Sequence, residues 1–286
     1  MWQELEGGCE YCSTKLATKN PGPDWSFLES VVVICLRERD DRFAEACGEL
    51  HYSGLCQRKP IFYRPDRHPE GFVVGCWDSH LQVARRLAER GNKCALVLED
   101  DFYLTRECSP EEVADRTNSM LAILPQDKWK RFMLGHMSWL HLPYRANVSR
   151  VFGLFTHAVV LSQRGIEWVL NNPPQSFPPI DSTMAIRMSH SYGPVESLVF
   201  QRVTSKSDRS AQLNSQDPLM YPENMRENTW RVWLVWAVAL LALFLIFFGV
   251  LYFLCKVRWR VALIVSIPLA LAPLIVGWVL ILTDVV

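Results

Sequence analysis

The sequence has no excess of charge of either sign, because 30 aspartates and glutamates balance its 30 lysines and arginines. A protein that binds nucleic acid needs a basic face that replaces the counterions of the phosphates. The composition gives no sign of such a face, so we expect no nucleic-acid partner. The charged residues lie almost entirely in the first 226 residues, and the remainder is apolar apart from one short basic break. The composition therefore indicates that these two parts of the chain lie in different solvents.

The sequence also lacks the dense, regular cysteine spacing of a small disulfide-stapled domain. Its nine cysteines are odd in number and scattered, so mostly reduced thiols are the simplest interpretation. Cys9 and Cys12 form one Cys-x-x-Cys pair, but a structural zinc site needs four ligands and no second pair follows. We favour an ordinary N-terminal loop or a local disulfide, with zinc binding as the alternative.

The start of the sequence lacks the features of a secretory signal. Residues Met1 to Gly8 are polar and acidic, whereas a signal peptide begins with a basic region followed by an apolar one. We therefore expect any membrane insertion to come from the C-terminal end.

Two long apolar runs lie at the C-terminal end, at about residues 232–254 and 261–282. At a rise of about 1.5 Å per residue, a helix of either run crosses a hydrocarbon core of about 30 Å. The sequence therefore predicts a multi-pass membrane protein with two transmembrane helices in residues 230–286, preceded by a polar linker over residues 209–229. The alternative is a buried helical hairpin of a soluble core, which rarely contains such long runs without charge.

Two signals conflict over the side of the membrane on which the rest of the chain lies. The turn between the two runs carries Lys256, Arg258 and Arg260, and the positive-inside rule places such a turn in the cytosol and the large domain in the lumen or outside. Without a signal peptide, however, about 225 residues would have to cross before the first helix. We expect a domain that faces the cytosol, with the lumenal side as the alternative. Glycosylation of the Asn147-Val-Ser149 sequon would indicate the lumen.

Short apolar runs rich in β-branched residues alternate with amphipathic segments in the first 208 residues. The runs are typical of buried strands, and the amphipathic segments are typical of helices packed on a sheet. This alternation predicts an α/β sheet with helices on both faces. We expect strands at Ser30–Cys35, Cys94–Leu98, Arg131–Leu134 and Ala158–Leu161, and helices at about Arg42–Leu50, Ser79–Glu89, Ser109–Leu124 and Ser162–Leu170.

Three consecutive acidic residues, Glu99, Asp100 and Asp101, directly follow the second of these strands. Ligands of α/β sheets bind at the carboxyl ends of strands. Adjacent carboxylates beside an apolar core repel one another, and a hard divalent cation such as Mg²⁺ or Mn²⁺ relieves the repulsion. Glu99 and Asp101 share one face of an extended segment, so we predict that Asp101 binds a metal together with Glu99 or Asp100. For the triplet by itself, an exposed acidic turn is the alternative.

Several motifs around the triplet follow one another in a definite order over about Val31 to Asp208, most of the polar part of the chain. They are Val33–Arg42, Gly75-Cys-Trp-Asp-Ser-His80, Leu96–Phe102, Gly153–Gly165, Ile180-Asp181, Pro194, Gln201 and Ser207-Asp208. In this order they resemble the motifs of family 25 glycosyltransferases, the lipopolysaccharide and collagen galactosyltransferase group. Trp77, Asp78 and His157 depart from the residues that are usual in the family.

The resemblance implies a GT-A-like nucleotide-diphospho-sugar transferase domain over residues 29–208, after an N-terminal segment of residues 1–28. The implied reaction moves a hexose, galactose or glucose, from a UDP-sugar to a hydroxyl of a glycan, lipid or protein acceptor, with inversion. The implied cofactor is Mn²⁺ or Mg²⁺, which bridges to the donor diphosphate.

The resemblance also suggests roles for individual residues. Arg37, Arg42 and Asp100 would contact the donor, although surface ion pairs are the alternative for the arginines. We expect Asp181 to follow a proline-stiffened loop and to act as the general base, with Glu196 as the reserve candidate. His80 would hydrogen-bond the donor or hold the metal loop, and a purely structural role is its alternative.

Two other functions compete with a hexosyltransferase. The first is a catalytically inactive, membrane-tethered glycosyltransferase-like binding protein, against which the retained acidic triplet, His80 and Asp181 argue. The second is a metal-dependent phosphohydrolase, which would need further Asp or His ligands from several strand ends. We therefore expect an enzyme that transfers sugar.

Overall fold

The computed structural model describes most of the first 202 residues. Apart from Leu245, the described residues belong to the first of two compact units, Met1–Pro222. Among them, no helix is long and apolar enough to cross a bilayer. Several predictions lie outside the described residues: the linker, both transmembrane segments except Leu245, the Cys9 and Cys12 pair, and Ser207-Asp208. The described residues are 2–4, 22–145, 147–154, 156–172, 179–202 and 245.

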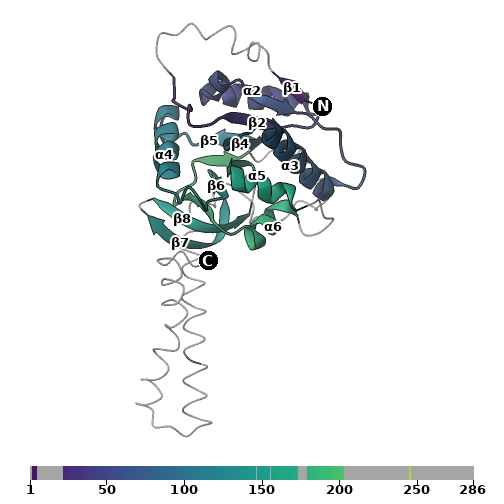
Figure 1. Ribbon diagram of the computed structural model, residues 1–286. Coiled ribbons are helices and arrows are strands. Elements are labelled where there is room, and N and C mark those ends of the chain that lie inside the picture. Colours follow the sequence, from purple (N-terminus) through teal and green to yellow (C-terminus); the bar gives the residue numbers. More distant parts are fainter. Residues whose placement is uncertain are drawn as a thin grey trace, which may run out of the picture. The chain divides into compact units, whose positions relative to one another are not determined.

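A nine-stranded mixed sheet forms the centre of this unit (Figure 1). Its strand order is β1-β3-β2-β4-β9-β6-β10-β8-β7. Strands β3, β2 and β4 run parallel, whereas β9 runs antiparallel to both of its neighbours, β4 and β6. The strands are β1 (Trp2–Glu4), β2 (Ser30–Ile34), β3 (Ile61–Tyr63), β4 (Cys94–Glu99), β6 (Arg131–Met133), β7 (Met137–Arg145), β8 (Val148–Leu154), β9 (Ala158–Ser162) and β10 (Ser191–Pro194).

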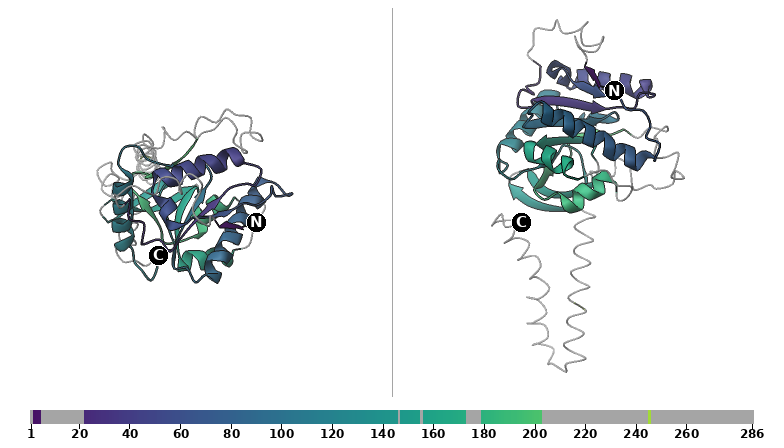
Figure 2. Two further views of the ribbon diagram at one scale, coloured as in Figure 1. Left: turned by 90° about the horizontal axis from the view of Figure 1, so that it is seen from above. Right: turned by 45° about the vertical axis from the view of Figure 1, so that its right-hand side comes forward.

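Helices cover both faces of the sheet, as the sequence predicts (Figures 1 and 2). Side chains alternate between the faces along each strand. Val31 and Val33 pack with helices α2 (Asp40–Tyr52) and α4 (Pro110–Ala122). Val32 packs on the other face, which is covered by α3 (Phe72–Glu89), α5 (Gln163–Leu170) and α6 (Ile180–Arg187). The predicted α/β class is confirmed, with a mixed sheet.

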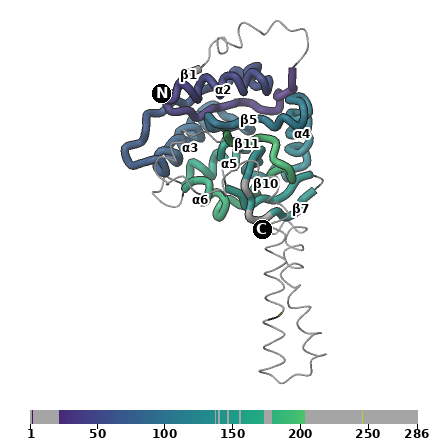
Figure 3. Tube along the Cα trace, turned by 180° about the vertical axis from the view of Figure 1, so that it is seen from behind, coloured from purple at the N-terminus to yellow at the C-terminus, as the bar shows by residue number. Residues whose placement is uncertain are grey.

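A separate two-stranded antiparallel sheet pairs β5 (Phe102–Leu104) with β11 (Val199–Gln201). Figure 3 shows the two strands side by side although they lie far apart in the sequence. Strand β5 follows β4 after a two-residue turn formed by Asp100 and Asp101. The pairing therefore brings Gln201, the last residue of β11, next to the acidic triplet.

All four predicted strands and all four predicted helices are present, with shifted ends. Helix α3 begins at Phe72 rather than at Ser79, after Gly71 with a φ of 98°, so His80 lies within the helix and not at its start. Strands β3, β5, β10 and β11 are three or four residues long, too short for a periodic pattern to reveal. The β7–β8 hairpin and the 3₁₀ helix at Leu55–Arg58 were also not predicted.

One local prediction near the site is wrong. Asp100 and Asp101 form a turn instead of continuing the extended strand, so strand alternation does not decide which way their side chains face. Ile180 and Asp181, which we expected to follow a proline-stiffened loop, lie directly after Pro179 in the first turn of α6, a helix that was not predicted. Proline is disfavoured within a helix but not at its start, so the same residue that signals a loop also permits a helix to begin.

A buried carboxylate ties α2 to the small sheet. Glu49 is 1% exposed, and its oxygens accept hydrogen bonds from the backbone N–H of Leu104 at 2.8 Å and from both terminal nitrogens of Arg106 at 2.9 and 2.7 Å. Arg202, just after β11, donates to the same carboxylate at 3.1 Å. Helix α2 and the β5–β11 pair are therefore held together by one charged group.

We predict that Glu49→Ala lowers the free energy of unfolding by about 1–3 kcal/mol, because the Leu104 N–H loses its acceptor. The half-exposed Arg106 can be hydrated, so the full penalty of a broken buried ion pair does not apply. Urea denaturation measures the change. The matched control is Glu45→Ala, which removes a more exposed carboxylate that also contacts Arg202, at 3.2 Å. Equal losses in the two variants would contradict the prediction.

Candidate functional site

Asp100 and Asp101 converge on one guanidinium at the carboxyl end of β4. Arg42 Nη1 donates to Asp100 Oδ1 at 2.7 Å and to Asp101 Oδ2 at 3.1 Å. Arg42 lies in the first turn of α2, and it is buried together with Asp101. The parallel neighbours β2 and β4 end at the same edge of the sheet, so the loop after β2 and the helix that follows it reach this turn.

Asp101 has one satisfied and one unsatisfied carboxylate oxygen. Oδ2 accepts a second hydrogen bond, from Gln201 Nε2 at 3.0 Å, and the Asp101 carbonyl accepts from the Arg202 N–H at 2.7 Å. Oδ1 is buried and has no hydrogen-bond partner among the described residues. Burial and the neighbouring charges of Glu99 and Asp100 raise the pKa of Asp101 from 3.8 to about 7.

Glu99, the last residue of β4, faces a different set of partners. Its Oε1 accepts from the Thr156 hydroxyl at 2.5 Å and lies 3.6 Å from His80 Nε2. Burial raises the pKa of Glu99, but His80 and Thr156 outweigh it and hold that pKa below its ordinary value. Cys76 lies one turn before His80 on α3, and its sulfur is close to both of these groups.

Asp181 lies close enough to this cluster for their charges to interact. Its negative charge, with those of Glu99 and Asp101, adds to the effect of burial and raises the pKa of the Cys76 thiol well above its ordinary value. Asp181 also acts on Arg131 of β6, which is completely buried. Burial lowers the pKa of Arg131 to about 9, and Asp181 offsets part of this effect.

The structure brings six of the eight candidate residues to one edge of the sheet: Arg42, His80, Glu99, Asp100, Asp101 and Asp181. Arg37 instead pairs with the exposed Asp66 at 3.3 Å. The Glu196 side chain is 75% exposed, and its carboxylate lies 4.0 Å from Arg116. Among the described residues, neither contacts the acidic turn.

Sequence reasoning assigned no role to Cys76, Thr156, Gln201 or Arg131, although the first three contact or adjoin the acidic residues. Cys76 had a signal in the sequence, because it precedes His80 by four residues and shares a face of any helix that contains both. Thr156 and Gln201 lie in segments that carry the family resemblance, but their contacts with the acidic residues had no local signal, because only the folding of the chain around β9 and β11 brings them to β4.

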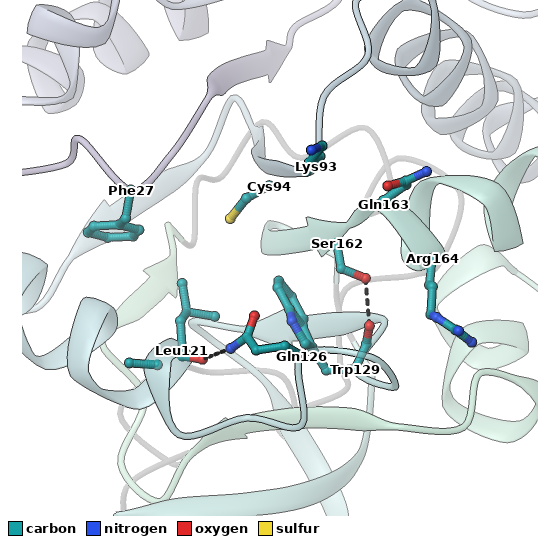
Figure 4. A pocket seen from close by; sticks show the side chains of 10 residues that line it. Phe27, Lys93, Cys94, Leu121, Gln126, Trp129, Ser162, Gln163 and Arg164 are labelled. Atoms are coloured by element: carbon teal, nitrogen blue, oxygen red, sulfur yellow. Dashed lines mark hydrogen bonds between the residues drawn. The ribbon is translucent and has the colours of Figure 1, made fainter.

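A cavity of about 440 Å³ lies at the other end of β4 (Figure 4). It lies beside Cys94, the first residue of β4, and Ser162, the last residue of β9, with Phe27 and Arg164 at opposite sides. The Ser162 hydroxyl donates to the Trp129 carbonyl at 2.6 Å, and Gln126 donates to the Leu121 carbonyl at 3.0 Å. These polar groups are engaged by backbone, and the described residues place no carboxylate in the lining of the cavity, so it offers less chemistry than the acidic turn.

No protein-family model matches the sequence, and no curated protein matches it. Among solved structures, one that resembles the chain is a glycosyltransferase involved in glycosylation of the major capsid of PBCV-1, with 9% identity, a TM-score of 0.41, and coverage of 65% of this chain and 98% of that one.

Two further solved structures are similar. A197 from STIV has 11% identity and a TM-score of 0.35, with 62% of this chain and 87% of that chain covered. A protein of Bacillus anthracis described as a glucose-1-phosphate thymidylyltransferase, in complex with sucrose, has 8% identity and a TM-score of 0.37, with 66% and 77% covered. At such scores, these likenesses establish neither the family nor the activity of this chain.

We predict that the loss of a proton from Asp101 lowers the free energy of unfolding of this unit as the pH rises from about 4 to 7. The raised pKa means that the folded chain keeps a proton that the unfolded chain has already lost. Its contribution is therefore fully present below the unfolded pKa and is lost as the pH rises through the folded one. Asp101→Asn has no carboxyl group to titrate at this position. Its free energy of unfolding minus that of the wild type should therefore become more positive across this window, and urea denaturation at a series of pH values measures the difference.

The exposed Asp115 of α4 supplies the control, because Asp115→Asn removes one negative charge away from the acidic turn. A difference between Asp101→Asn and the wild type that stays constant from pH 4 to 7 would contradict the assignment of a proton to Asp101.

Proposed function

We propose that the chain is a hexosyltransferase of the GT-A type, related to family 25, that transfers galactose or glucose from a UDP-sugar to a hydroxyl of a glycan, lipid or protein, with inversion. The observation that carries the proposal is the environment of Asp101. Its buried, unpartnered Oδ1 lies beside Glu99 and Asp100 at the carboxyl end of a central strand, where ligands of α/β sheets bind.

These carboxylates suit a hard divalent cation. Asp101 Oδ1 needs a partner that the described residues do not supply, and a cation would remove the repulsion that raises the pKa of Asp101. Asp101 and Glu99 would hold Mn²⁺ or Mg²⁺, which supplies positive charge to the departing diphosphate. Arg42 and Gln201 hold the other oxygen of Asp101 in place. Asp100, which Arg42 also binds, would contact the donor.

Asp181 serves as the general base in this proposal. Inversion requires a group that removes the proton of the acceptor hydroxyl as the sugar carbon is attacked. Asp181 lies in the first turn of α6, and its Oδ1 accepts from the Ser182 N–H at 2.7 Å and from the Ser182 hydroxyl at 3.3 Å. These bonds orient the carboxylate. His80 positions Glu99, next to the proposed metal.

One observation favours the second candidate function, an inactive binding protein that retains the fold. Arg42 Nη1 already bridges Asp100 and Asp101, and a guanidinium in this position neutralises carboxylates in the way that a metal does. In that case the acidic turn is a structural ion pair. Metal dependence separates the two candidates.

We predict that the purified full-length chain releases UDP from UDP-galactose or UDP-glucose in the presence of Mn²⁺, and that EDTA abolishes the release. Asp101→Ala should lower the rate by about 100-fold or more, because a metal supplies several kcal/mol of charge stabilisation. Asp181→Asn should lower it by about 10²–10⁴-fold, as expected for the loss of a general base. A coupled assay for UDP measures all three rates.

The exposed Asp115→Ala on α4 is the matched control and should retain the wild-type rate. UDP release that persists in Asp101→Ala contradicts the metal assignment. A wild-type chain that binds UDP but releases none from either sugar, with or without Mn²⁺, supports the inactive alternative.

We also propose that residues 232–254 and 261–282 anchor the enzyme in a membrane with the catalytic domain facing the cytosol. The support for the anchor is the length of the two uncharged apolar runs. In sealed vesicles that carry the full-length chain with its cytosolic side outward, added protease should digest the domain. Protection of the domain, or sensitivity of the chain to a glycosidase that depends on Asn147, would place the domain in the lumen.

A further inference from the structure

Cys76, His80 and Glu99 bring three different ligand atoms to one point. Cys76 and His80 are four residues apart on α3 and therefore share a helix face, which is turned toward the end of β4. The three ligand atoms all lie within 4.8 Å of one another, and His80 Nε2 is 3.6 Å from Glu99 Oε1. In a tetrahedral site with bonds of about 2.0–2.3 Å, ligand atoms are separated by roughly 3.3–3.8 Å. The side chains need to move little to surround a cation.

His80 has an unmet bonding requirement at this point. The residue is only 5% exposed, and its Nε2 is buried without a hydrogen-bond partner among the described residues. An unsatisfied buried polar atom costs free energy and calls for an explanation. A cation between His80 and Glu99 satisfies the imidazole nitrogen. The Thr156 hydroxyl, at 2.5 Å from Glu99 Oε1, holds the carboxylate in the manner of an outer-shell partner.

The chemistry of the three ligands selects the cation. A thiolate and an imidazole favour Zn²⁺ or Co²⁺, whereas Mn²⁺ and Mg²⁺ prefer oxygen and bind such mixed sites more weakly. We infer that Cys76, His80 and Glu99 form a binding site for a thiophilic divalent cation, Zn²⁺ by preference. On binding, the Cys76 thiol gives its proton to solvent and the thiolate binds the metal. Three protein ligands leave a fourth position open, as in catalytic zinc sites.

This site differs from the oxygen-only pair of Asp101 and Glu99, but it shares Glu99 with that pair. Zinc bound to Cys76 and His80 therefore withdraws Glu99 from the hard cation. This regulatory consequence rests on the proposed function, whereas the binding of zinc does not.

The test uses the full-length chain in which Cys9→Ser and Cys12→Ser remove the Cys-x-x-Cys pair. Titration with Co²⁺ should produce a thiolate-to-cobalt charge-transfer band in the near ultraviolet and the intense d–d bands of a tetrahedral site. The bands should saturate at one cobalt per chain and disappear when Zn²⁺ displaces it. Added to this background, Cys76→Ser should remove the charge-transfer band and weaken zinc binding by about 10–100-fold or more, at least as much as the loss of an outer-shell partner.

The matched control is Cys94→Ser in the same background, because Cys94 is another half-buried free cysteine, at the opposite end of β4. It should keep the band. A titration without a charge-transfer band overturns the inference, and so does a band that survives Cys76→Ser.

If circular dichroism shows that Cys76→Ser does not fold, His80→Gln replaces it. An unchanged zinc affinity in that variant would likewise overturn the inference. The cobalt spectrum does not depend on turnover. If the chain shows the band but transfers no sugar, the proposed function is contradicted and the zinc site is supported. If the chain shows Mn²⁺-dependent transfer and no band, only the zinc site is contradicted.

Discussion

The crowding of three adjacent carboxylates at the end of β4, with Asp101 buried and Glu99 and Asp100 half-buried, is the constraint on which the surrounding structure depends. The free energy of desolvation of a carboxylate is larger than the stabilisation that one contact supplies, and Glu99, Asp100 and Asp101 also repel one another. The chain meets this cost with two sets of partners. Arg42 and Gln201 bind the two aspartates, while Thr156 and His80 face Glu99. The tight turn after β4 makes this division possible, because it directs neighbouring carboxylates to different partners.

The division also explains why so many separate segments meet at this edge. Helices α2 and α3, the start of α6, the residues before β9 and the end of β11 each contribute a group to the neighbourhood of the turn. Glu49 holds α2 against β5, so the arginine and the carboxylates that it binds belong to one framework. Even so, Asp101 Oδ1 and His80 Nε2 stay without hydrogen-bond partners among the described residues. These two atoms lie beside the carboxylates at the end of β4, so they are where we propose that a cation binds.

Two kinds of cation would compete for these atoms. The oxygens of Asp101 and Glu99 suit a hard ion, and the sulfur and nitrogen of α3 suit a softer one. Glu99 belongs to both sets, so the rotamer of one side chain decides which set is complete. Such sharing links the metal that supports sugar transfer in our proposal to the metal that would suppress it.

The sequence by itself determined the α/β class, four strands and four helices, because these features follow from local periodicity and from caps such as Ser109 and Ser162. It also singled out Arg42, His80, the acidic triplet and Asp181, which the fold brings together. Only the tertiary structure decided the antiparallel placement of β9, the pairing of β5 with β11, and the partners of each carboxylate. The contacts of Thr156 and Gln201 with the acidic residues carry no local signal, although both residues lie in segments that match the family pattern, since these contacts join distant parts of the chain. Asp100 and Asp101 show the same limit, because the turn that separates them from Glu99 is stabilised by Arg42, far away in the sequence.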